Sequence, residues 1–92
     1  MDSNFSSRPQ KMDSEQESQQ GSFLVLHNDE VNTFEFVMDT LVEVCNHTSN
    51  QAEQCAMITH YKGKCEVLIG EMKELKEIKN ELITRGLKAT IE

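Results

Sequence analysis

The sequence contains no long apolar run and is short of basic residues. A helix that crosses a bilayer needs about 20 consecutive apolar residues, and no stretch approaches that length, so we predict no membrane-spanning helix. Nine Lys and Arg residues stand against sixteen Asp and Glu residues, which gives a formal net charge of −7. That charge would repel a phosphate backbone, so we expect no nucleic acid partner. A cationic ligand suits the chain better.

Several chemical motifs are also missing. The amino-terminal stretch MDSNFSSRPQKMDSEQESQQ lacks the basic flank and apolar core of a secretory signal, so we expect a cytoplasmic protein. The three cysteines, Cys45, Cys55 and Cys65, form no Cys-x-x-Cys pair, and buried free thiols in a reducing compartment explain them most simply. The four glycines are isolated, which excludes a phosphate-binding loop. Only Cys45-x-His47 brings two potential metal ligands together, so we predict no metal site and no cofactor.

The chain has the size of one small domain, with 92 residues and a mass of 10.5 kDa. Residues 1–20 are rich in Ser, Gln, Asp and Glu and carry few apolar side chains. Burial of so few apolar groups cannot offset the entropy that ordering would cost. We therefore predict a disordered amino-terminal extension over 1–20 and one folded domain over 21–92.

The spacing of apolar residues in the second part predicts the order strand, helix, helix, strand, helix, strand. A continuous apolar run at 23–26 and alternating apolar positions at 64–70 and 87–91 predict the strands. Apolar residues at helical spacing predict helices over 33–46, 50–62 and 72–83. The predicted fold class is an α+β sandwich, in which a three-stranded antiparallel sheet packs against three helices.

Polar residues and glycine indicate where the first two helices begin and end. Asn32 precedes Glu35 by three positions, as in a capping box, and is the predicted N-cap of the first helix. Thr48 or Ser49 is expected to cap the second helix, and Gly63 stands where a left-handed residue is expected to end it. The second helix therefore covers roughly 50–62.

A polar cluster, His27-Asn28-Asp29-Glu30, stands where the first strand meets the first helix. Asn and Asp are common in turns, and acidic residues near a helix start complement the helix dipole, so the cluster alone has a simple structural interpretation. Together with His60, near the end of the second helix, it offers an amide oxygen, carboxylates and a ring nitrogen as acceptors. Acceptors of these kinds that converge on one point would suit an ammonium group.

The sequence resembles a known family in three stretches. LHNDEVNTFEFVMDTL, the later AMITHYKGKCEV and the closing LKATIE are similar to ClpS, the adaptor of the Clp protease that delivers substrates with destabilising amino-terminal residues (N-degrons). The resemblance covers nearly all of residues 22–92 and includes an extension ahead of the fold. It implies the same order of strands and helices as the apolar pattern does.

The resemblance also implies a function and assigns residues to it. It implies a non-enzymatic adaptor that binds the free amino-terminal residue of a substrate and presents the substrate to the amino-terminal domain of a Clp-type AAA+ unfoldase. The extension over 1–20 would be the segment that the unfoldase engages. The α-amino group of the substrate would be bound by Asn28, Asp29, Glu30 and His60. The hydrophobic pocket for the first side chain would be lined by Phe34, Val37, Ala56, Thr59 and Leu87.

The chain departs from the usual family pattern at a few of these positions. Glu30 stands in place of a second Asp, and its extra methylene group displaces the carboxylate. Phe34 and Ala56 stand where members commonly carry Met, the first as a gate to the pocket and the second as part of its wall. Asn32-Thr33 stands where Thr-Pro is common. A larger gate and a smaller wall would reshape the specificity of the pocket.

Two other functions remain open from the residues. One is a small interaction module like the carboxy-terminal domain of the ribosomal stalk protein, which has a similar order of elements but lacks the Asn-Asp-acidic cluster with a partner His. The other is an enzyme that uses a Cys and a His as a nucleophilic pair. Three thiols that fail to react at neutral pH would exclude the enzyme.

Overall fold

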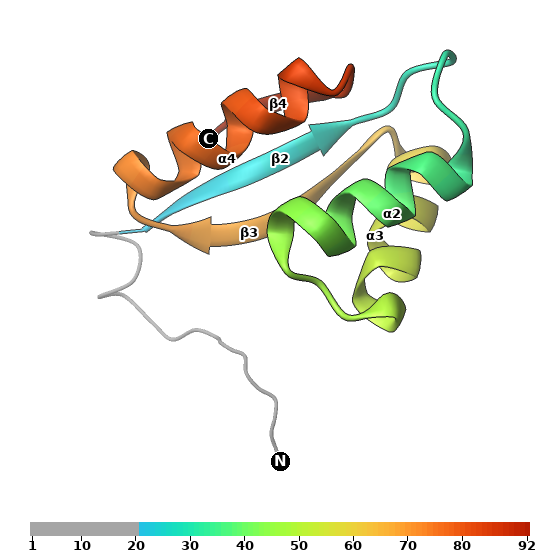
Figure 1. Cartoon of the computed structure of the whole chain (residues 1–92), viewed down its shortest axis with the longest axis horizontal. Helices are drawn as coiled ribbons and strands as arrows, with labels where there is room; N and C mark the ends of the chain where they lie inside the picture. Colours follow the sequence, from blue (N-terminus) through green and yellow to red (C-terminus); the bar gives the residue numbers. More distant parts are fainter. Residues whose placement is uncertain (1–20) are drawn as a thin grey trace.

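The structure is a computed structural model that describes residues 21–92. The predicted extension over 1–20 lies outside the described residues. Strands and helices follow one another in the predicted order, and the α+β class is confirmed (Figure 1). The elements are β2 (Ser22–His27), α2 (Phe34–Cys45), α3 (Ser49–Lys62), β3 (Lys64–Gly70), α4 (Met72–Thr84) and β4 (Lys88–Ile91).

The sheet is antiparallel and has the strand order β3-β2-β4. Because β2 is the central strand, its last residue, His27, pairs with Lys64 of β3 on one side and with Lys88 of β4 on the other. β3 begins directly after α3, and β4 begins directly after Leu87. The polar cluster that follows β2 therefore emerges between the end of α3 and the start of β4.

One hydrophobic core joins the sheet to all three helices. Leu24 and Leu26 of β2 pack in one cluster with Leu41 of α2 and with Leu75 and Leu82 of α4. Each of these side chains is at most 2% exposed, and burying one Leu contributes about 1.5 to 3 kcal/mol. Figure 1 shows α4 lying along the sheet, while α2 and α3 pack against each other beside it.

The ends of the first two helices follow local rules, with one correction. The N-cap of α2 is Thr33, whose hydroxyl accepts a hydrogen bond from the Phe36 amide at 3.0 Å, so the prediction of Asn32 as the N-cap is wrong. Both residue types cap helices well, and the amide of Asn32 is engaged elsewhere. Thr48 caps α3 in a capping box with Gln51, as one of the two predicted possibilities. Gly63 ends α3 at φ +95°, as predicted.

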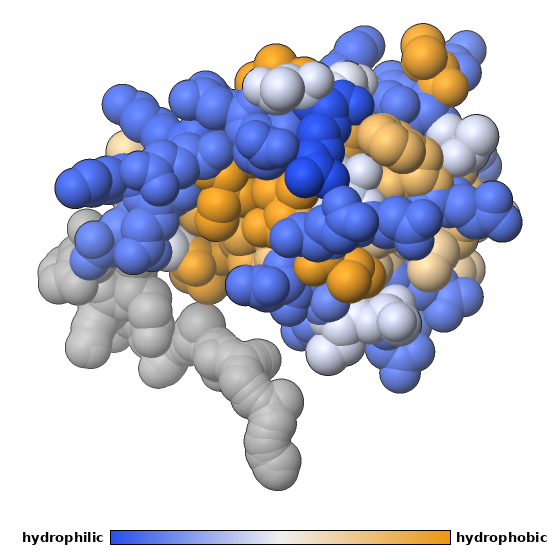
Figure 2. All heavy atoms as spheres, in the orientation of Figure 1, coloured by the Kyte–Doolittle hydropathy of each residue, from blue (hydrophilic) through white to orange (hydrophobic). Residues whose placement is uncertain are grey.

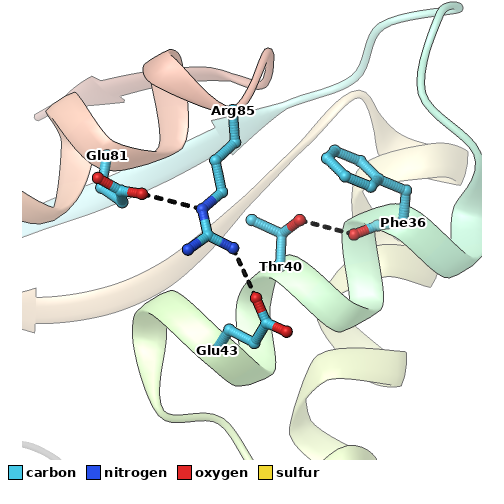
Figure 3. Close-up of polar contacts among 5 residues, drawn as sticks. All are labelled: Phe36, Thr40, Glu43, Glu81 and Arg85. Atoms are coloured by element: carbon cyan, nitrogen blue, oxygen red, sulfur yellow. Dashed lines mark hydrogen bonds and ion pairs between the residues drawn. The ribbon is translucent and has the colours of Figure 1, made fainter.

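Helices α2 and α4 are also joined at the surface by Arg85, which follows α4 (Figure 3). Its Nη1 donates to Glu43 of α2 at 2.6 Å, and its Nε donates to Glu81 of α4 at 2.9 Å. These two carboxylates raise the pKa of Arg85 above its ordinary value. The pairing positions the residue just before the turn that leads to Leu87 and β4.

Within residues 21–92, no helix is both long enough and apolar enough to cross a bilayer.

Candidate functional site

A cavity of about 670 Å³ opens at the end of β2. It is bounded by the loop after β2, the start of α2, the second half of α3 and the residue before β4. The nine residues that the resemblance implied come from four separate stretches, and all of them line this one cavity. They are Asn28, Asp29, Glu30, Phe34, Val37, Ala56, Thr59, His60 and Leu87.

Five further residues line the cavity. His27 belongs to the polar cluster noted in the sequence, whereas sequence reasoning did not single out Leu26, Asn32, Met57 and Tyr61 as members of the site. A signal for two of them exists, because Met57 precedes His60 by three residues and Tyr61 by four, spacings that make Met57 a neighbour of both on the helix surface. The rings of Tyr61 and His60 meet edge to face, with their centroids 4.8 Å apart. Tyr61 is 76% exposed and forms part of the rim of the cavity.

The polar side of the cavity is the loop that follows β2. Its first residue, Asn28, is anchored by its backbone N–H, which donates to the Gly63 carbonyl at the end of α3 at 2.9 Å. This bond fixes the start of the loop beside the helix turn that carries His60. The side chains of Asn28, Glu30 and His60 are all exposed to solvent. They are therefore open to a ligand that enters the cavity.

Asp29 differs from its neighbours because its carboxylate is already engaged by the protein. Oδ1 accepts from the backbone amides of Val31 and Asn32, each at 2.9 Å, and Oδ2 accepts from the Asn32 side chain at 2.9 Å. Partial burial alone would raise the pKa of Asp29, but the bonds from Asn32 and Val31 and the charge of Lys88 outweigh it, so the pKa lies below its ordinary value. Asp29 thus supplies a fixed negative charge at neutral pH, with little free acceptor capacity.

The apolar side of the cavity is made of buried residues. Ala56, Thr59 and Leu87 are each at most 5% exposed, whereas Phe34 is 41% exposed. The Thr59 hydroxyl donates to the Cys55 carbonyl at 2.7 Å, so it needs no polar partner inside the cavity. A buried apolar wall opposite exposed acceptors can accommodate a ligand with a cationic end and a hydrophobic group.

The cavity lining contains no cysteine. Cys45 and Cys65 are buried, Cys55 is half-buried, and all three are free. Burial raises the pKa of Cys45 to about 11. A hydrogen bond with Cys65 is the main cause that raises the pKa of Cys55, and burial is the next largest cause. The same hydrogen bond lowers the pKa of Cys65. A Cys and His nucleophilic pair would therefore have to lie outside this cavity.

Cys55 lies instead with His47 in a shallower hollow at the other end of α3. The Nε2 atom of His47 is 2.8 Å from the Val67 carbonyl oxygen, and its buried Nδ1 atom has no hydrogen-bond partner among residues 21–92. Within residues 21–92, no three His, Cys, Asp or Glu side chains are grouped so that they could bind a metal ion.

Apolar surface is also visible between α4 and α2 (Figure 2). Exposed apolar residues on these helices include Phe36 and Val42 of α2 and Ile83 of α4. The carboxylates of Glu43 and Glu81 are paired with Arg85, as Figure 3 shows. An ammonium ligand would have to compete with that guanidinium, so the cavity at the end of β2 is the better candidate site.

The fold and the cavity together define a small α+β binding module. The family model of the ATP-dependent Clp protease adaptor protein ClpS matches residues 17–90, and the chain therefore belongs to the ClpS family. This confirms the family resemblance found in the sequence.

Individual relatives agree with the family match. The chain is 38% identical over 55 residues to the ATP-dependent Clp protease adapter protein ClpS of Nitratidesulfovibrio vulgaris strain Miyazaki F, covering 58% of this chain and 55% of the relative. The same adapter protein of strain DP4 is 40% identical over 55 residues, covering 58% and 53%. The chain thus spans about half the length of the curated relatives it matches.

A solved structure shares the fold. Agrobacterium tumefaciens ClpS2, determined bound to L-phenylalaninamide, superposes with a TM-score of 0.69 at 24% sequence identity. The match covers 79% of this chain and 95% of that chain. The two chains therefore share their architecture.

Proposed function

We propose that this protein is an adaptor without enzymatic activity that binds the free amino-terminal residue of substrate proteins. The preferred first residue has a bulky hydrophobic side chain. The adaptor then delivers the bound protein to a Clp-type AAA+ unfoldase in the cytoplasm by docking on the amino-terminal domain of the unfoldase. Residues 21–92 form the binding domain in this proposal, and the extension over 1–20 acts during delivery.

The observation that carries this proposal is the pairing of acceptors with an apolar wall in one cavity. Asn28, Glu30 and His60 are exposed on its polar side, and Asp29 contributes a negative charge there. An α-ammonium group is a small cation with three N–H donors, so it would use two or three of these acceptors at once. We assign amine binding to these four residues.

The first side chain of the substrate would enter the apolar part of the cavity. Burying a Leu or Phe side chain contributes about 1.5 to 3 kcal/mol, and each hydrogen bond to a charged group contributes about 1.5 to 3 kcal/mol. Four such contacts near the upper end of these ranges can reach micromolar affinity, about −8 kcal/mol, after an association cost of about 4 kcal/mol. We assign the side-chain pocket to Phe34, Val37, Ala56, Thr59 and Leu87.

The ligand of the fold relative supports this assignment chemically. L-phenylalaninamide, the compound bound to Agrobacterium tumefaciens ClpS2, has a free α-amino group, a phenylalanine side chain and an amide in the position of the next peptide bond. It therefore mimics the first residue of a protein chain. The acceptors and the apolar wall found in this chain match both ends of such a molecule.

A pair of peptides tests the proposal. Both have the same sequence, begin with Phe or Leu and carry a fluorophore at the carboxy terminus, but one has a free amino terminus and the other is acetylated. We expect saturable binding of the free peptide alone in fluorescence anisotropy, because acetylation removes the charge and two of the three N–H donors and so leaves acceptors unpaired. Equal binding of both, or of neither, would reject recognition of the chain end and favour a stalk-like interaction module.

A further inference from the structure

Asn32 makes a contact that its place in the sequence does not explain. Its side-chain Nδ2 donates to Asp29 Oδ2 at 2.9 Å and also to the Gly86 carbonyl oxygen at 3.0 Å. Its backbone N–H donates to Asp29 Oδ1 at 2.9 Å. One residue thus bonds both carboxylate oxygens of Asp29 and reaches a turn that lies 54 positions further along the chain.

The Gly86 carbonyl lies next to a wall residue of the cavity, because Leu87 follows it directly in the chain. Gly86 has φ +97° and forms the turn after α4, directly before Leu87, which lines the cavity and is 4% exposed. The turn is held on its other side by the Leu87 amide, which donates to the Leu82 carbonyl at 3.0 Å. Asn32 therefore joins the acidic loop to a turn that is itself fixed to the core.

The loop from Asn28 to Asn32 is consequently fastened at both ends. The backbone of Asn28 is bonded to Gly63 at the end of α3, and the side chain of Asn32 is bonded to Gly86 at the start of β4. Asp29 and Glu30 lie between these two points.

We infer that Asn32 is the positioning residue of this cavity, which fastens the acidic loop to the Gly86–Leu87 turn and sets the spacing between the amine-binding rim and the apolar wall. As far as the ligand is concerned, this inference rests on the proposed function. The attachment itself is independent of what the cavity binds. Thr33 makes the capping bond at the start of α2, so Asn32 has no capping role there. Asn32 acts through its bonds to Asp29 and Gly86.

The bonds from Asn32 also affect the charge of the loop. They help to lower the pKa of Asp29, against the effect of burial, while Lys88 of β4 acts in the same direction. The other titratable groups that line the cavity are His27 of β2, Glu30 of the loop, and His60 and Tyr61 of α3. Loss of Asn32 should therefore raise the pKa of Asp29. A measurement on the Asp29 carboxyl group itself separates this change from changes at the neighbouring groups.

The test uses Asn32→Ala and the nearly isosteric Asn32→Asp, with Asn80→Ala on the exposed surface of α4 as the matched control. Binding of a peptide with a free amino-terminal Phe is measured by anisotropy, and the Asp29 carboxyl carbon is titrated by NMR. We expect Asn32→Ala to weaken peptide binding about tenfold and to raise the Asp29 pKa. Asn32→Asp should weaken binding further, because it removes the donors and adds a like charge. The control should change neither quantity.

The outcomes separate this inference from the proposed function. Wild-type affinity together with an unchanged Asp29 titration in Asn32→Ala would overturn the positioning role. If wild-type protein binds no peptide, the proposed function fails, but the attachment is still tested by the Asp29 titration and by amide exchange at Val31 and Leu87. Faster exchange at these two amides in both variants, with the rest of the core still protected, would support the attachment. If Asn32→Ala fails to fold, Asn32→Asp provides the same readouts.

Discussion

The two ends of helix α3 each carry a hollow lined by a histidine, and the two histidines differ in almost every physical respect. His60, near the carboxy-terminal end, is exposed and lies in the cavity beside Asn28 and Glu30. His47, just ahead of the amino-terminal end, is 8% exposed, and its Nε2 atom is 2.8 Å from the Val67 carbonyl oxygen. The residue type is the same, but one side chain is available to a ligand and the other is part of the core.

The burial of a polar side chain in a small domain indicates whether it serves stability or binding. His47 is buried and links the start of α3 to β3 through one hydrogen bond. A polar group in that position contributes to stability because its partner would otherwise be buried and unpaired. His60 has an exposed ring, so replacing its side chain should matter only if something binds there. Stability measurements and binding measurements should therefore separate the two residues.

The largest effect is expected from His47→Ala. The change removes a buried ring and leaves the Val67 carbonyl without its partner, so the free energy of unfolding should fall by about 2 to 4 kcal/mol. Urea denaturation monitored by circular dichroism measures this value. Peptide affinity of the fraction that remains folded should stay within a factor of two to three of wild type, as a rough limit. A loss of binding in folded His47→Ala protein would contradict the separation between the two ends of α3.

The next effect is expected from His60→Ala, and it should appear in binding. Loss of one hydrogen bond to a charged amine should weaken a peptide with a free amino-terminal Phe by about 10- to 100-fold. The free energy of unfolding should remain that of wild type, because the side chain is exposed. Anisotropy and urea denaturation on the same preparation give both values. Unchanged affinity would remove His60 from the site.

A smaller effect, and one that depends on the peptide, is expected from Ala56→Met. Ala56 is 3% exposed and lines the cavity, so a longer side chain there would reduce the space for a large first residue. Affinity for a peptide that begins with Phe should fall by about tenfold, and affinity for one that begins with Leu should fall less. Competition anisotropy with the two peptides measures the ratio. An equal loss for both would indicate a general disturbance of α3.

The smallest effect is expected from Asp29→Asn, and it should depend on pH. The pKa of Asp29 is lowered on folding from an ordinary value of 3.8. Its contribution to stability is therefore present above about pH 4 and is lost as the pH falls through the lowered value. The variant should be slightly less stable than wild type at pH 7, and the difference should disappear at strongly acidic pH. A difference that persists unchanged in acid would show that charge is not the cause. Urea denaturation at both pH values measures it.

Much of the molecule followed from short-range patterns in the sequence. The apolar spacing predicted every element of residues 21–92 to within one or two residues, because the helical and strand periods are set by backbone geometry. Gly63, and Thr48 as one of two possible caps, were predicted for a similar reason, since a cap is a contact between residues close together in the chain. The family resemblance, not these patterns, supplied the assignment of residues to a site.

Patterns in the amino-acid sequence were enough to predict the order and type of the elements, the acidic character of the chain and the polar cluster that follows β2. The folded arrangement then shows which of those polar side chains are exposed to a ligand. It showed that Asn32 is bonded to Gly86 and Asp29 and does not cap α2, and that Met57 and Tyr61 belong to the rim of the cavity. A side chain bonds to whichever groups lie within reach in space, however far apart they are in the chain. One partner of Asn32, Gly86, is 54 residues away in the sequence.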